Sequence, residues 1–123
     1  MPWQESYTLK HPEMDQTHQE FIELLDQLNQ AKGETFVSLF HTLKSHTQKH
    51  FDQELAWMQQ SHFSSTAEHN ADHQRILGEI NQMEKRLRPA TLPLVKAWAS
   101  ERLPQWFDLH ISTMDSALAA HLR

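Results

Sequence analysis

Histidine is unusually frequent in this chain, with ten in 123 residues, and imidazole is the most common metal ligand in proteins. Five of these histidines and two carboxylates interrupt apolar stretches of helical spacing: His18, His50, Glu54, His69, His73, His110 and Asp115. Buried polar groups need hydrogen-bond partners, and buried charges need a counter-charge or a metal. Mutual hydrogen bonds alone would hardly satisfy so many converging groups, so the pattern predicts a metal centre.

The number and type of these side chains narrow the choice of metal. The set is too large for one tetrahedral zinc ion and too rich in nitrogen for calcium or magnesium. Two six-coordinate ions roughly 3.5–4 Å apart could share the two carboxylates. Imidazole combined with carboxylate suits iron, and the set leaves one coordination position without a side chain. The chain has no cysteine, so thiolate ligands are excluded, and it lacks the Glu-x-x-His motif of ferritin-like di-iron proteins.

Each spacing alone is weak evidence. In a chain so rich in histidine, about one His-x3-His pair is expected by chance, and His46 and His50 form a second such pair besides His69 and His73. A lone His18 would more often be a hydrogen-bonded histidine of a helix bundle. The metal prediction therefore depends on the combination, in which every predicted helix contributes at least one of the inward-facing groups.

The spacing of His110 and Asp115 is unusual for two ligands of one site. A five-residue step is roughly 500° of an ideal helix, which leaves the side chains about 140° apart. Two geometries could still bring them together. In the first, they lie on opposite flanks of the buried stripe, with Ile111 and Met114 on the seam between them. In the second, a π-bulge widens the helix locally. We expect the flank-to-flank arrangement, because it needs no distortion.

Four amphipathic stretches must position these residues. Apolar residues recur at steps of three and four over about 13–32, 35–61, 66–88 and 92–121, after an arm of about 1–12. Short polar breaks join them, so the sequence predicts an all-α, antiparallel up-down four-helix bundle with an N-terminal arm, forming a single domain over 1–123.

Local signals predict where these helices start and stop. Gly33 suits the position after a helix, and Thr35 and Thr91 can cap the helices that follow. Ser65-Thr66-Ala67-Glu68 has the form of a capping box. Pro104 should kink the fourth helix or force it to restart.

Composition excludes several classes of partner. A net charge of −5 argues against nucleic acid or an anionic membrane as the main partner. The longest apolar runs are a few residues, too short to span a bilayer, and the N-terminus lacks the features of an export signal. We therefore expect a cytoplasmic protein with no membrane or nucleic-acid partner.

Four motifs together resemble those of the hemerythrin family, specifically the single-domain bacterial hemerythrins. In chain order they are Asp15-x-x-His18, His50-Phe51-x-x-Glu54 with Met58, His69-x3-His73, and Trp106-x3-His110-Ile111-x3-Asp115. They span residues 15–115 in the order and spacing of the family. One departure is Leu55, which stands where the family often has a second glutamate.

The resemblance implies a non-haem di-iron site. His69, His73 and His110 would hold one iron ion, and His18 and His50 the other. Glu54 and Asp115 would bridge the two ions together with an oxo or hydroxo group from solvent. The iron with fewer histidines would keep an open position for dioxygen, in a dry pocket. Candidates for the pocket wall are Phe21, Leu25, Trp57, Trp106 and Ile111.

Reversible dioxygen binding is the function that we expect, for storage, for delivery to an oxygen-using enzyme, or for sensing through a signalling partner. The alternative is a di-iron redox enzyme acting on peroxide or nitric oxide, since the same ligands serve both. A third hypothesis is a metal-storage or interaction module. The other histidines are expected at the surface: His11, His41, His46, His62 and His121. Of these, His46 could support His50 from one turn away.

Overall fold

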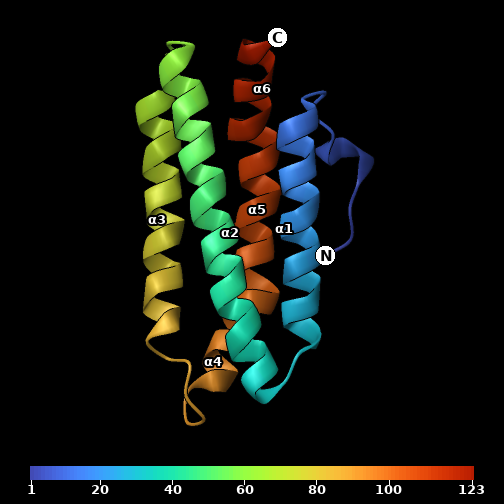
Figure 1. The fold of residues 1–123 in the computed structure, drawn as a ribbon, viewed down its shortest axis with the longest axis vertical. Helices are drawn as coiled ribbons and strands as arrows, with labels where there is room; N and C mark the ends of the chain where they lie inside the picture. The colour runs from blue at the N-terminus through green and yellow to red at the C-terminus, as the bar shows by residue number, and fades with distance from the viewer.

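The computed structural model of the protein describes residues 1–123 and contains only helices. Three long α-helices come first: α1 (Pro12–Gln30), α2 (Gly33–Gln60) and α3 (Thr66–Glu84). The fourth helix consists of five consecutive stretches: α4 (Leu92–Ala97), a π stretch Trp98–Arg102, α5 (Leu103–His110), a π stretch Ile111–Asp115, and α6 (Ser116–Leu122). Figure 1 shows these four helical rods running alternately in opposite directions. The predicted antiparallel four-helix bundle is confirmed.

Apolar side chains from all four rods form one core. Among the fully buried residues are Phe36, Phe40, Leu43, Ile80 and Leu118, and burial of one such side chain stabilises the fold by about 1.5–3 kcal/mol. These residues lie on the stripes that the three-and-four spacing predicts. None of the helices is sufficiently long and apolar to cross a lipid bilayer.

The helix ends differ from the predicted caps. Helix α2 begins at Gly33, two residues before Thr35, and Gly33 has a φ of +53°, in the left-handed region that favours glycine. Neither Ser65 nor Thr91 caps its helix with its side chain. The Thr91 hydroxyl instead donates to the backbone carbonyl of Arg86 at 2.8 Å. Ser65 and Thr91 therefore occupy the predicted N-cap positions without the capping side-chain hydrogen bond, and the predicted cap at Thr35 is wrong because Lys32 holds that position.

Pro104 lies where α-helical hydrogen bonding resumes after the first π stretch. The backbone N–H of Leu103 donates to the carbonyl of Trp98, five residues earlier. Pro104, which has no N–H, follows as the second residue of α5. The helix therefore restarts at this point without leaving the bundle (Figure 1), which is one of the two predicted outcomes.

The N-terminal arm is fastened to the bundle. The Tyr7 ring packs edge-on against Phe107, with centroids 5.9 Å apart, and its hydroxyl donates to Asp108 at 2.8 Å. The backbone N–H of Leu9 donates to the Asp15 carboxylate at 2.8 Å. Asp15, which belongs to the first hemerythrin-like motif, therefore holds the arm against α1.

Candidate metal centre

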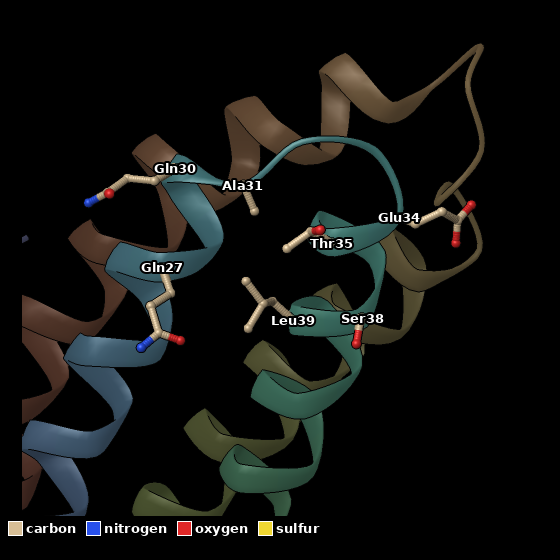
Figure 2. A pocket seen from close by; sticks show the side chains of 7 residues that line it. All are labelled: Gln27, Gln30, Ala31, Glu34, Thr35, Ser38 and Leu39. Atoms are coloured by element: carbon tan, nitrogen blue, oxygen red, sulfur yellow. The ribbon is translucent and has the colours of Figure 1, made fainter.

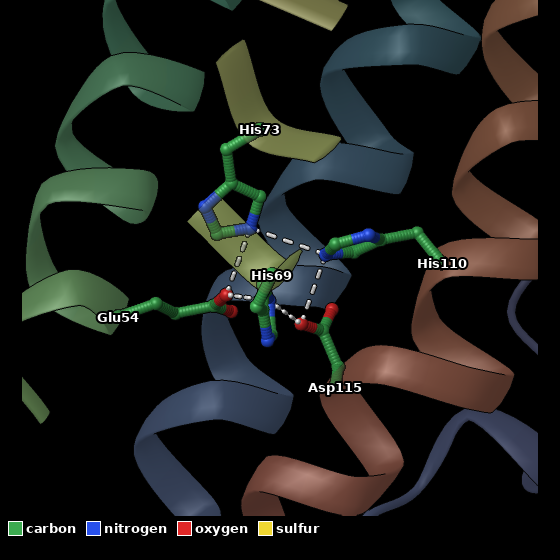
Figure 3. Close-up of side chains that lie close together, drawn as sticks. All are labelled: Glu54, His69, His73, His110 and Asp115. Carbon is green, nitrogen blue, oxygen red and sulfur yellow. Dashed lines mark hydrogen bonds and ion pairs between the residues drawn. The ribbon is translucent and has the colours of Figure 1, made fainter. Parts of the chain in front are cut away.

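All the side chains that the sequence selected as ligands meet in the interior of the bundle. They form two groups, within each of which the ligand atoms lie less than 4.8 Å from one another. The first group comprises Glu54, His69, His73, His110 and Asp115, drawn in Figure 3. The second comprises His18, His50, Glu54 and Asp115. The two carboxylates are common to both groups, so they lie between the two sets of histidines.

Three histidine rings surround one side of the carboxylates. Glu54 Oε1 lies 3.1 Å from His69 Nε2 and 3.2 Å from His73 Nε2. Asp115 Oδ1 lies 3.1 Å from His69 Nε2 and 3.1 Å from His110 Nε2. Figure 3 shows the rings converging on this pair of oxygens. Each ring therefore presents its Nε2 atom to the same small volume.

The other two histidines approach the remaining carboxylate oxygens. Glu54 Oε2 lies 2.7 Å from His50 Nε2 and 3.8 Å from His18 Nε2. Asp115 Oδ2 lies 3.1 Å from His18 Nε2. Each carboxylate thus directs one oxygen toward the group of three histidines and the other toward the pair, which is the arrangement of a bridging ligand.

Hydrogen bonds among these groups do not satisfy them. Glu54 is fully buried and Asp115 is 1% exposed, yet Glu54 Oε2, His18 Nε2 and both Asp115 oxygens lack a hydrogen bond of good geometry. The Nε2 atoms of His73 and His110 lie 3.1 Å apart, facing each other. Buried polar atoms in proteins are normally paired. Two cations between the groups would satisfy them, and a donor set of imidazole and carboxylate fits iron.

A π turn brings His110 and Asp115 to the same site. Residues Ile111–Asp115 are π-helical, and the backbone N–H of Ser116 donates to the carbonyl of Ile111, five residues earlier. In such a turn, residues five apart take the positions that residues four apart have in an α-helix. The expected flank-to-flank arrangement is wrong, because the backbone widens instead of the two side chains reaching around an ideal helix.

In the metal-free protein, the carboxylates hold protons on neighbouring rings. Burial would lower the pKa of His18, but contacts with Asp115 and Glu54 outweigh burial and raise it to about 9. The same balance raises the pKa of His69 to about 9. Burial and the charge of Glu54 would raise the pKa of Asp115, yet the ring of His110 holds it below the usual range. Metal ions would therefore displace protons from this centre on binding.

Asp72 adjoins the candidate site and was not predicted from the sequence. Its Oδ2 accepts hydrogen bonds from His110 Nδ1 at 2.7 Å and from Trp106 Nε1 at 3.1 Å. Because Nδ1 of His110 carries that proton, its Nε2 is left free to bind a metal. Asp72 directly precedes His73, so it lies about 100° from the ligand stripe of its helix. For that reason the periodic pattern predicts that the Asp72 side chain faces solvent.

A small cavity adjoins the pair of histidines. It offers about 10 Å³ to the centre of a water-sized molecule, and its lining residues are His18, Phe21, Thr47, His50, Phe51, Trp106, Phe107, His110 and Asp115. Two of the predicted wall residues, Phe21 and Trp106, line it. Leu25, Trp57 and Ile111 do not: Leu25 and Ile111 lie in the core, and Trp57 packs against His11, with ring centroids 4.7 Å apart.

The histidines outside the motifs have other environments. His41, His62 and His121 are exposed, as expected. His11 is half-buried and caps α1, where its Nδ1 accepts from the backbone N–H of Met14 at 3.1 Å. His46 is also half-buried and pairs with Glu20 at 3.3 Å. The expected support of His50 by His46 is wrong, because the His46 ring points toward Glu20 on α1.

A larger hollow lies at the C-terminal end of α1, where the chain turns into α2. Figure 2 shows it at the turn between α1 and α2, with a volume of about 660 Å³. Its lining residues are Gln27, Gln30, Ala31, Glu34, Thr35, Ser38 and Leu39. One carboxylate and no histidine face this hollow, so it offers no converging set of metal ligands.

A four-helix bundle whose interior holds two groups of histidines joined by shared carboxylates defines a class of cation-binding proteins. The chain belongs to the family described as the hemerythrin HHE cation binding domain, whose model matches residues 10–122. The resemblance inferred from the four motifs is thereby confirmed.

Two curated relatives cover nearly the whole chain. The chain is similar to a bacteriohemerythrin of Ralstonia nicotianae, with 29% identity over 120 residues, which make up 98% of this chain and 87% of that protein. It is also similar to a myohemerythrin of Sipunculus nudus, with 27% identity over 113 residues, which make up 92% of this chain and 86% of that protein. No solved structure matches the chain significantly.

Proposed function

We propose that this protein binds dioxygen reversibly at a non-haem di-iron centre. The observation that carries the proposal is the bridging geometry: Glu54 and Asp115 each direct one oxygen toward the group of three histidines and the other oxygen toward the pair. Membership of the hemerythrin family supports it. Storage, delivery to an oxygen-using enzyme and sensing through a signalling partner would all use the same centre.

The proposed ligands divide as the two groups do. His69, His73 and His110 would hold one iron ion, His18 and His50 would hold the other, and both carboxylates would bridge, with a solvent-derived oxo or hydroxo group between the ions. When bound, two ferrous ions supply the electrons for reversible oxygen binding. Because His18 and His50 would give their ion fewer protein ligands than the other three histidines, a position for a small ligand would lie on their side.

Protein side chains would orient the ligands and exclude water around this position. The Phe51 ring stacks on His73 with centroids 3.8 Å apart, and Trp106 stacks on His110 at 4.6 Å. Phe21 and Phe107 stack at 4.7 Å in the cavity wall. Phe21, Phe51, Trp106 and Phe107 form the apolar part of the lining, and the cavity has room for about one water-sized molecule, which suits a diatomic ligand better than a larger one.

The test is a spectrum of the protein reduced without oxygen and then exposed to air. We expect two iron ions per chain and a visible absorption band that disappears under vacuum and returns with air. His18→Ala should abolish the band, whereas the surface control His41→Ala should leave it unchanged. Purification with zinc or without metal would refute the di-iron proposal. Immediate oxidation with consumption of peroxide would favour the redox enzyme instead.

A further inference from the structure

Thr47 has a buried hydroxyl that the proposed metal centre does not use. The residue is 3% exposed, and its Oγ1 has no hydrogen-bond partner within the protein. Three other helical threonines behave differently. The hydroxyls of Thr17, Thr42 and Thr113 donate to the carbonyl four residues earlier, at 3.0, 3.2 and 2.7 Å. The Thr47 hydroxyl therefore gives up the hydrogen bond that a helix ordinarily offers.

The position of Thr47 places its hydroxyl at the small cavity beside the candidate metal centre. Thr47 lies three residues before His50 on α2, so the two side chains share a helix face. Both line the small cavity beside His18. Thr47 is the one hydroxyl-bearing residue in that lining, and the indole N–H of Trp106 is already donated to Asp72. The cavity therefore combines aromatic walls with one uncommitted O–H donor.

We propose that the Thr47 hydroxyl donates a hydrogen bond to a small ligand held in this cavity and thereby selects ligands that carry an acceptor atom. The inference rests on the proposed function, since it assumes that ligands enter on the side of His18 and His50. The volume of about 10 Å³ is close to what one water molecule needs, so only a very small ligand can approach this hydroxyl. Hydrogen bonds to charged acceptors are roughly twice as strong as neutral ones, so small anions should respond most.

Azide titration of the diferric protein tests the proposal. We expect Thr47→Val, which replaces the hydroxyl by a methyl group of similar size, to weaken azide binding about tenfold to a hundredfold. Thr47→Ser should stay close to the wild type because it keeps a donor. The control Thr42→Val alters a hydroxyl on the same helix that bonds to the carbonyl of Ser38, and it should leave azide affinity unchanged.

A second measurement needs no metal. If the hydroxyl has no structural partner, metal-free Thr47→Val should unfold at the same temperature as the wild type or at a higher one. A lower unfolding temperature would show that the hydroxyl supports the fold, and it would overturn the inference. Equal azide affinity in Thr47→Val, or no azide binding by the wild type, would overturn it as well.

The two proposals can fail separately. A wild-type protein that holds two irons but does not release oxygen under vacuum would refute reversible carriage. The azide comparison would still decide the role of Thr47, because it uses the diferric protein and involves no oxygen.

Discussion

Replacement of Asp72 tests whether the structure around the ligands fixes the metal affinity. The Asp72 carboxylate accepts from His110 Nδ1 at 2.7 Å. The His110 side chain is 2% exposed and that of Asp72 is 18% exposed, so water can hardly replace the carboxylate as acceptor. Asp72→Asn keeps the size of the side chain and leaves a neutral acceptor, whereas Asp72→Ala removes the acceptor altogether.

The expected magnitude follows from this geometry. A hydrogen bond to a charged group contributes about 1.5–3 kcal/mol, which corresponds to about a tenfold to hundredfold change in an equilibrium constant. Loss of such an outer carboxylate in other metal sites has a similar effect on affinity. We therefore expect Asp72→Asn to weaken iron binding about tenfold and Asp72→Ala about a hundredfold.

The assay is competition for ferrous iron between the protein and a chromophoric chelator. Asp52→Asn is a suitable control, because Asp52 is exposed on α2 and accepts a hydrogen bond only from Gln48 at 3.0 Å. It should bind iron as the wild type does. Unfolding temperatures of the metal-free variants would separate loss of affinity from loss of fold. If both Asp72 variants retained iron like the wild type, the positioning argument would be refuted.

Three further predictions concern the arm, the core and the metal-free centre. Burial and the hydrogen bond to Asp108 raise the pKa of Tyr7 to about 12. Because Tyr7 is the only tyrosine of the chain, its titration can be followed by ultraviolet absorbance and should have its midpoint near that value. Asp108→Asn should move the midpoint toward the ordinary value of about 10. Leu25→Ala should lower the free energy of unfolding in urea by about 2–5 kcal/mol, because Leu25 is fully buried. The pKa values of His18 and His69, about 9, exceed the unfolded value of 6.5, so their protonation stabilises the metal-free fold fully below pH 6.5. This stabilisation should disappear as pH rises through 9, and a flat unfolding temperature between pH 6 and pH 10 would contradict it.

The sequence predicts the bundle because burial and periodicity are directly linked. Residues such as Phe21, Leu25 and Leu28 fall on one stripe of α1, and all three are buried. The helix caps were not predictable in the same way. Ser65 and Thr91 have the side chains that caps require, but a hydroxyl can choose among several nearby carbonyls and N–H groups. Local geometry decides that choice.

The sequence also predicts which side chains converge, because polar residues on buried stripes stand out. Asp72 and Thr47 escape the same reasoning for opposite reasons. Asp72 lies beside its stripe, where a carboxylate normally faces water. Thr47 lies on its stripe, but threonine is tolerated there whenever it bonds to its own helix. Only the positions of Trp106 and His110 on the facing helix show what Asp72 does.

The π turn shows why residue patterns could not choose between the two geometries for His110 and Asp115. In both, Ile111 faces the core and Ser112 and Thr113 face solvent, and the structure has this pattern. The geometries differ only in the backbone, where the hydrogen bond from Ser116 spans five residues. A hydrophobic pattern reports which side is buried, but it does not report the pitch of the helix.

Hydroxyl side chains accompany both π stretches. Widening a helix weakens its regular ladder, and hydroxyl side chains can satisfy the carbonyls nearby. The Ser112 hydroxyl donates to the carbonyl of Asp108 at 2.6 Å, and the Thr113 hydroxyl to that of Leu109 at 2.7 Å. In the first π stretch, the Ser100 hydroxyl donates to a carbonyl at 3.2 Å. Thr17 and Thr42 make the same kind of bond in regular α-helix, so these hydroxyls help to satisfy the carbonyls of the π stretches but do not by themselves distinguish a π turn from a flank-to-flank reach.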